Sequence, residues 1–250
     1  MQFSANLGFL WADRPLPAAI LAAKAAGFHA VECHWPYDIP AEEVAKALSE
    51  TGLQMRGLNT RRGKPGENGL SALPDRRDEA RAAVDEALRY AKVTGTQCIH
   101  VMAGFATGPD AEDAFTETLS YACAKASDKT ILIEPLNHYD APGYFLQTTA
   151  QAKAIIARVG APNLKLMFDC YHVQLMEGDV SNALERLRPI IGHVQVASVP
   201  DRGAPDHGEL DYSHIWKVLT RIGWNAPIGA EYKPGRDTAA TLGWLKDHQS

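Results

Sequence analysis

Short apolar runs alternate along the chain with longer amphipathic segments. We interpret the apolar runs as buried strands because they are too short for helices and end at polar residues or turn signals. The predicted strands cover residues 3–9, 30–33, 53–58, 98–102, 130–134, 164–169, 193–197 and 227–231. The segments between them are predicted helices, over residues 15–26, 40–51, 76–93, 111–126, 148–159, 181–187, 213–222 and 238–246.

Regular alternation of strand and helix predicts βα units around a parallel sheet. Eight such units in 250 residues favour an α/β fold made of one closed (β/α)8 barrel domain over residues 1–250. The alternative is an open doubly wound sheet, which usually carries a glycine-rich phosphate turn after its first strand. Residues 6–9 offer no such turn, and the glycines at 63, 66 and 69 lack the Lys-Ser/Thr of a phosphate loop. The barrel is therefore the preferred fold.

Polar residues end or interrupt four of the predicted strands in the second half of the chain. They are Glu134, Asp169, Gln195 and Glu231. Packing does not explain them, because burying an uncompensated charge is costly. In a barrel, the carboxyl ends of the strands converge on one face, so these side chains are expected to meet there. Four oxygen donors are typical ligands of one hard divalent cation, with Mg²⁺ or Mn²⁺ favoured over zinc. The alternative is that they form salt bridges or other polar contacts at the barrel ends.

Five short motifs carry a family resemblance. They are Ile-Glu-Pro-Leu-Asn at 133–137, Phe-Asp-Cys-Tyr-His at 168–172, Gly-His-Val-Gln at 192–195, Asp-His-Gly-Glu-Leu-Asp-Tyr at 206–212 and Gly-Ala-Glu-Tyr at 229–232. Together, over nearly the whole chain, they resemble the hydroxypyruvate isomerase family of xylose-isomerase-like TIM barrels. The resemblance implies a metal held by Glu134, Asp169, Gln195 and Glu231, with both glutamates also exchanging protons with substrate. Related ketose 3-epimerases typically have histidine as the third ligand, so Gln195 favours the isomerase branch.

The chemistry of such an isomerase agrees with these residues. Converting hydroxypyruvate to tartronate semialdehyde requires removing a proton beside the carbonyl and returning it to the neighbouring carbon. A divalent ion can stabilise the enediolate as a Lewis acid, and two carboxylates can act as base and acid. We assign the acid and base roles to Glu134 and Glu231 and leave their order open.

Three further polar residues are candidates for substrate binding. His172, on the predicted loop after the sixth strand, is expected to bind a substrate oxygen or to support a metal ligand. His100 and Asn59 lie near the ends of the fourth and third strands, where they either face the pocket or bond loop backbone. His193 is expected to point toward the lower barrel, in a structural role.

Cations follow several predicted strands in this acidic protein. They are Arg61, Arg62, Lys64, Arg202, Lys233 and Arg236. Arginine suits bidentate binding of a carboxylate, and the resemblance also places a substrate-contacting arginine at Arg202. Most of the others are expected to be solvated loop charges. The family usually has an acidic loop where residues 59–69 are basic, so a four-carbon acid, as taken by 2-oxo-tetronate isomerases, is an alternative to hydroxypyruvate.

Three further function classes are less favoured. A metal-dependent endonuclease would need a histidine-rich multi-metal cluster and a basic face, whereas the net charge is -5. We therefore expect no nucleic-acid partner. The remaining two classes are a ketose 3-epimerase and a non-catalytic barrel that binds a sugar acid.

Composition bears on location and assembly. The four cysteines form no CxxC pair, which favours free thiols in a reducing compartment. No apolar stretch reaches membrane-spanning length and the N-terminus lacks a signal-peptide pattern, so we expect a cytoplasmic protein with no membrane partner. Trp11, Trp35 and Trp224 are candidates for the interface of a homo-oligomer, or for residues that cap the barrel or line its mouth.

Overall fold

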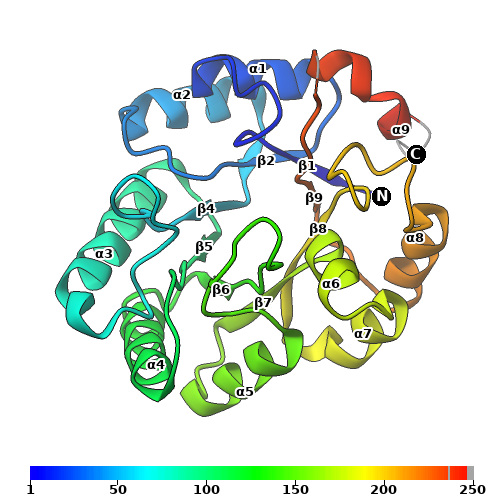
Figure 1. The fold of residues 1–250 in the computed structure, drawn as a ribbon. Helices are drawn as coiled ribbons and strands as arrows, with labels where there is room; N and C mark the ends of the chain where they lie inside the picture. The colour runs from blue at the N-terminus through cyan, green and yellow to red at the C-terminus, as the bar shows by residue number, and fades with distance from the viewer. Residues whose placement is uncertain (236, 247–250) are drawn as a thin grey trace.

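The computed structural model describes residues 1–235 and 237–246. Within them the parallel strands form one sheet in the order β3-β2-β1-β9-β8-β7-β6-β5-β4, encircled by helices (Figure 1). The strands at the two ends of this order, β3 and β4, are consecutive in sequence, so the sheet is a nearly closed barrel. The predicted TIM barrel is confirmed. Its strands are β1 (Phe3–Asn6), β2 (Ala30–Glu32), β3 (Gln54–Met55), β4 (Gly57–Asn59), β5 (Cys98–His100), β6 (Thr130–Ile133), β7 (Leu164–Asp169), β8 (Ile191–Val196) and β9 (Ile228–Ala230).

The third predicted strand is divided at Arg56. On one side β3 pairs with β2, and on the other β4 pairs with β5. The Arg56 N–H donates to the carbonyl of Val31, and the Arg56 carbonyl accepts from the N–H of Cys98. The two short strands therefore act as one barrel strand that passes from one neighbour to the other.

The first predicted strand is too long, because the chain turns after Asn6 instead of continuing to Phe9. The side-chain oxygen of Asn6 accepts from the Gly8 N–H at 2.9 Å, and its carbonyl accepts from the Phe9 and Leu10 N–H groups. Asparagine favours such a local turn because its side chain can replace a backbone acceptor.

Helices follow the strands and pack around the barrel (Figure 1). They are α1 (Leu16–Ala25), α2 (Ala41–Thr51), α3 (Arg77–Thr94), α4 (Pro109–Lys125), α5 (Thr149–Val159), α6 (Cys170–Met176), α7 (Val180–Leu187), α8 (Tyr212–Arg221) and α9 (Gly243–Lys246), with short 3₁₀ turns at Pro74–Arg76, Arg188–Ile190 and Thr238–Thr241. Two predictions were wrong. The expected loop after β7 is helix α6, and the helix expected at 238–246 is a 3₁₀ turn followed by α9. None of the helices in the described part of the chain has the length and apolar character needed to cross a membrane.

The barrel interior has an apolar layer below its polar mouth. Cys98, Leu132 and Met167, from β5, β6 and β7, form a small buried cluster. Leu132 and Met167 also border a cavity of about 20 Å³, together with His100 and Gln195.

The three tryptophans considered for an interface have different surroundings. Trp11 is buried and packs edge-on against Phe28, so it is not a surface residue. Trp35 lines the pocket at the mouth, and Trp224 lies under the guanidinium of Arg188. The four cysteines are buried free thiols.

Candidate active site

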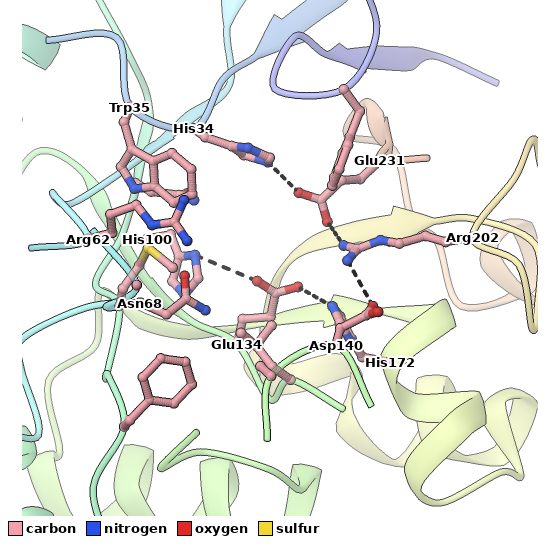
Figure 2. Close-up of a pocket in the computed structure, with 17 residues that line it drawn as sticks. His34, Trp35, Arg62, Asn68, His100, Glu134, Asp140, His172, Arg202 and Glu231 are labelled. Atoms are coloured by element: carbon pink, nitrogen blue, oxygen red, sulfur yellow. Dashed lines mark hydrogen bonds and ion pairs between the residues drawn. The ribbon is translucent and has the colours of Figure 1, made fainter. Parts of the chain in front are cut away.

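A pocket of about 380 Å³ opens at the carboxyl ends of the strands (Figure 2). It is lined by all six residues predicted for catalysis or substrate binding, which are Asn59, His100, Glu134, His172, Arg202 and Glu231. Asn59 and His100 are the last residues of β4 and β5. His100 is buried, and neither of its ring nitrogens has a hydrogen-bond partner among the described residues. Burial lowers its pKa to about 3, so its ring is neutral.

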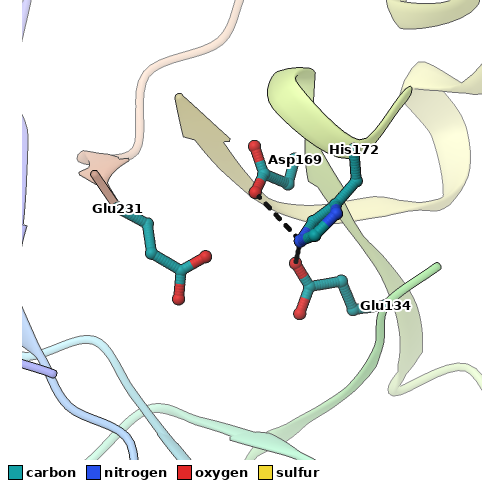
Figure 3. A group of neighbouring side chains, drawn as sticks. All are labelled: Glu134, Asp169, His172 and Glu231. Atoms are coloured by element: carbon teal, nitrogen blue, oxygen red, sulfur yellow. Dashed lines mark ion pairs between the residues drawn. The ribbon is translucent and has the colours of Figure 1, made fainter. Parts of the chain in front are cut away.

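Three predicted metal ligands come together beside this pocket. Glu134, Asp169, Glu231 and His172 each offer one ligand atom, and these atoms lie within 4.8 Å of one another (Figure 3). Asp169 is the last residue of β7, while the two glutamates come directly after β6 and β9. All four side chains are buried. Three carboxylates at this spacing repel one another, so the arrangement favours a cation between them.

Gln195, the fourth predicted ligand, lies beside Asp169 in the register of β7 and β8. Its side-chain nitrogen donates to Glu32 Oε1 at 2.8 Å. Its oxygen, Oε1, is buried and accepts no hydrogen bond from the described part of the chain, and the same is true of Glu134 Oε1 and Asp169 Oδ2. Buried oxygen atoms are seldom left without partners. These three acceptors therefore fit the ligand set of a hard divalent cation.

The two carboxylate oxygens of Asp169 have different roles. Oδ1 accepts from the Tyr171 N–H at 2.9 Å and caps the N-terminus of α6. Oδ2 is left to face the cluster. Because the cap starts a helix directly after β7, His172 lies three residues after Asp169, in the first turn of α6. His172 is therefore also at the mouth of the barrel.

His172 is held as a hydrogen-bond donor rather than as a metal ligand. Its Nδ1 accepts from the Asn137 backbone N–H at 3.1 Å and lies 2.7 Å from the Asn137 side-chain nitrogen. The side-chain oxygen of Asn137 accepts from two backbone N–H groups, which fixes the amide orientation. The neutral ring therefore carries its proton on Nε2, 3.6 Å from Asp169 Oδ2 and 3.9 Å from Glu134 Oε1. Burial, followed by the charge of Arg202, lowers its pKa to about 3.

The carboxyl groups of the cluster have different electrostatic surroundings. Burial, together with the charges of Glu231 and Asp169, raises the pKa of Glu134 well above its usual range. Burial also raises the pKa of Asp169, to about 7. Burial acts in the same direction on Glu231, but a hydrogen bond from His34 at 2.9 Å and the charge of Arg202 outweigh it and lower its pKa to about 2. Without a cation, these surroundings favour ionisation of Glu231 and oppose ionisation of Glu134.

Arg202 already has carboxylate partners within the protein. Its Nη2 donates to Glu231 Oε2 at 2.8 Å, and its Nη1 donates to Asp140 Oδ2 at 3.2 Å (Figure 2). The guanidinium carbon lies 4.9 Å from the ring centroids of both Phe9 and Tyr171. The backbone of Arg202 is left-handed, with φ of 57°, and is held by hydrogen bonds to Ser198 and Lys233. These contacts fix the arginine against Glu231.

Four residues of the site were missed in the sequence. Asn6, Glu32, His34 and Asp140 all bond a candidate ligand or Arg202. Glu32 had a detectable signal, since it ends the apolar run Ala30–Val31 just as Glu134 ends its own strand. Oε2 of Glu32 lies 2.7 Å from Nε2 of His193, which precedes Gln195 by two residues on β8. His193 therefore bonds the same carboxylate as Gln195.

The comparisons with known proteins agree with this fold. A family model described as the xylose isomerase-like TIM barrel matches residues 20–248. The chain belongs to this family. The 2-oxo-tetronate isomerase of Cupriavidus necator is 43% identical, over 99% of this chain and 98% of that protein. The hydroxypyruvate isomerase of Escherichia coli is 36% identical, over the full length of both. The resemblance to the hydroxypyruvate isomerase family is therefore confirmed.

A solved structure matches the whole barrel. The crystal structure of a family 2 AP endonuclease from Brucella melitensis superposes with a TM-score of 0.96 and 36% identity, covering 100% of this chain and 99% of that one. The name of that protein differs from those of the isomerases, so the chemistry has to be argued from the site itself.

Proposed function

We propose that this protein is a metal-dependent isomerase of a short hydroxy-oxo acid, with hydroxypyruvate as the leading substrate. Two full-length relatives with isomerase names support the reaction class. The observation that carries the proposal is the set of buried oxygens on Glu134, Asp169 and Gln195 that accept no hydrogen bond from the described residues and lie beside an open pocket. The four-carbon acid of the 2-oxo-tetronate isomerases is the second candidate, supported by the relative at 43% identity.

The proposed cofactor is one Mg²⁺ or Mn²⁺ ion. Glu134, Asp169, Gln195 and Glu231 would hold it, and Arg202 would then share Glu231 with the ion. When bound, the ion supplies Lewis-acid stabilisation of the negative charge that develops on the substrate oxygens.

The residues of the chain would handle the proton. Glu134 and Glu231 enter the pocket from β6 and β9, so a flat intermediate lying between them would have one carboxyl group on each side. One takes the proton from the carbon next to the carbonyl, and the other returns a proton to the neighbouring carbon. The Nε2–H of His172 donates to a substrate oxygen, because its Nδ1 is already engaged.

The rival functions are less well supported by this site. A ketose 3-epimerase of this family typically has histidine where Gln195 stands. For an endonuclease, we expect several metal ions held largely by histidines. The candidate cluster found among the described residues has three carboxylates and one histidine, and that histidine is a donor.

Proton exchange in D₂O tests the proposal. The protein would be incubated with hydroxypyruvate, 2-oxo-tetronate or neutral ketoses, with Mg²⁺, with Mn²⁺, or after treatment with EDTA. We expect metal-dependent isomerisation of an acid, with deuterium incorporated beside the carbonyl, measured by NMR. Exchange of ketoses alone would favour an epimerase. Metal binding with no exchange of any compound would favour a binding protein, and cleavage of DNA with abasic sites would favour an endonuclease.

A further inference from the structure

The pocket contains a second arginine, and none of the carboxylates in the described residues forms an ion pair with it. Arg62 lines the pocket from the loop after β4, and in the described part of the chain no Asp or Glu lies within ion-pair distance of it. Given the isomerase activity proposed above, we propose that Arg62 binds the carboxylate of the acid substrate and thereby selects acids over neutral ketoses.

The three cations of this loop have different environments. Arg61 donates to both oxygens of Glu86, at 2.9 and 3.1 Å, outside the pocket. Lys64 does not line the pocket, and Arg62 does, although both side chains are exposed. Only Arg62, of these three, contributes to the lining. Of the two cations that follow β9, Lys233 does not line the pocket and Arg236 lies outside the described residues.

Contacts with the protein hold Arg62 in place. Its guanidinium carbon lies 4.5 Å from the ring centroid of Trp35, whose Nε1 donates to the Thr60 carbonyl at 3.1 Å. Its Nε donates to the Glu67 carbonyl at 2.9 Å. Stacking and the Nε bond fix the plane of the guanidinium while its two terminal nitrogens keep free N–H groups. Those nitrogens can bind a carboxylate in a bidentate manner.

The negative charges around the pocket support a role for Arg62 in binding an anion. Glu134, Asp140 and Glu231 line it, and they would repel an anionic substrate. Arg202 bonds two of these carboxylates, so its charge is already balanced. Figure 2 shows Arg62 on the side of the pocket opposite Arg202 and Glu231, and His100 and Asn68 line the same pocket.

Because Arg62 and the proposed proton-transfer residues lie on different sides of the pocket, they would bind the substrate in one orientation. The carboxylate end would meet Arg62 and the amide of Asn68, and the oxo and hydroxyl groups would face Glu134, His172 and Glu231. A neutral ketose lacks the group that Arg62 recognises. Specificity for acids would therefore come from the loop after β4, while proton transfer would depend on the strand ends.

Arg62→Met is the test, with Arg61→Met as the matched control. Steady-state kinetics with the acid substrate and Mn²⁺ would be combined with inhibition by dihydroxyacetone, which resembles hydroxypyruvate with a hydroxymethyl group in place of the carboxylate. We expect Arg62→Met to raise KM for the acid by about tenfold or more, equivalent to about 1.4 kcal/mol. The kcat and the inhibition constant of dihydroxyacetone should change less than about twofold, and Arg62→Lys should recover part of the loss. Arg61→Met should behave as the unmodified protein.

The outcomes separate this inference from the proposed function. If the unmodified protein isomerises no acid, the proposed function fails and this inference fails with it. If it isomerises an acid and Arg62→Met keeps the same KM, only the role of Arg62 is wrong. An equal weakening of acid and dihydroxyacetone binding would show that Arg62 merely shapes the loop, which also overturns the inference.

Discussion

Gln195 donates its side-chain N–H to Glu32 Oε1 at 2.8 Å, and this bond orients the amide so that its oxygen is left for the proposed metal ion. Burial opposes ionisation of Glu32, but His193 and the amide of Gln195 outweigh burial and lower its pKa. A Cβ at Gly229 would lie 2.6 Å from Glu32 Oε1 and 2.8 Å from Gln195 Cγ, so the pair also requires glycine at this point of β9.

Replacing Glu32 should weaken metal binding although Glu32 is not a proposed ligand. We expect Glu32→Leu to lower the affinity for Mn²⁺ by about tenfold or more, since losing a group that orients a ligand typically costs about 10–100-fold. Glu32→Gln should keep most of the affinity, because its amide oxygen can still accept from Gln195. Calorimetry or Mn²⁺ EPR on the unloaded proteins measures this. Wild-type affinity in a folded Glu32→Leu protein would contradict the assignment.

Replacing Glu134 and replacing Glu231 should change the free energy of unfolding by different amounts. Both Glu134→Gln and Glu231→Gln should lower kcat by about 100-fold or more, since each removes a proton-transfer group. In the metal-free protein, Glu134→Gln should leave the free energy of unfolding nearly unchanged, because Glu134 is already disposed to be neutral. Glu231→Gln should reduce it by about 3 kcal/mol, because a buried partner of Arg202 is lost.

Denaturant unfolding after EDTA treatment, together with turnover in D₂O, checks this pair of variants. Exposed Glu43→Gln provides the control, with no expected change in either quantity. Near-normal turnover in either active-site variant would refute the acid and base assignment. Equal stability losses in both would contradict the electrostatic difference between them.

His172 should be neutral and unnecessary for metal binding. Since its Nδ1 accepts from the Asn137 N–H and its pKa is lowered to about 3, ¹⁵N NMR should show the Nε2–H tautomer from pH 5 to 9. We expect His172→Gln to lower kcat while changing Mn²⁺ affinity less than about threefold, in contrast to Asp169→Asn, which should weaken it by about tenfold or more. Loss of Mn²⁺ binding in His172→Gln would identify the histidine as a ligand instead.

The loop that carries Arg202 should have a pH-dependent contact at His207. Hydrogen bonds to Asp201 at 2.9 Å and to Asp206 at 2.7 Å raise the pKa of His207. The pKa of His207 is higher in the folded protein than in the unfolded chain, where it is about 6.5. Protonated His207 therefore contributes fully to stability below the unfolded-state pKa, and this contribution disappears as pH rises through the folded-state pKa. The effect should be small, since the side chain is half exposed.

Thermal melting from pH 5 to 9 would measure this contribution. The Tm difference between the unmodified protein and His207→Gln should shrink as pH increases. A difference that stays constant or grows would show that protonated His207 does not stabilise the loop.

The sequence by itself determined the barrel and the positions of the main site residues. Short apolar runs mark buried parallel strands, and a polar residue at the end of such a run must lie at the mouth of the barrel, which located Glu134, Asp169 and Glu231. The same reasoning would have found Glu32. Strand lengths were less accurate, because local turns such as the one at Asn6 depend on side-chain hydrogen bonds that hydrophobic periodicity does not encode.

Only the tertiary structure decided how these side chains are paired. Arg61 and Arg62 are neighbours with the same charge, yet one meets Glu86 outside the barrel and the other enters the pocket. Likewise, Glu32 and Gln195 are 163 positions apart, and closure of the sheet around β1 and β9 brings them together. The physical reason is that burial sets which residues point inward, whereas hydrogen-bond and ion-pair partners depend on side-chain directions and distances that exist only after the barrel has closed.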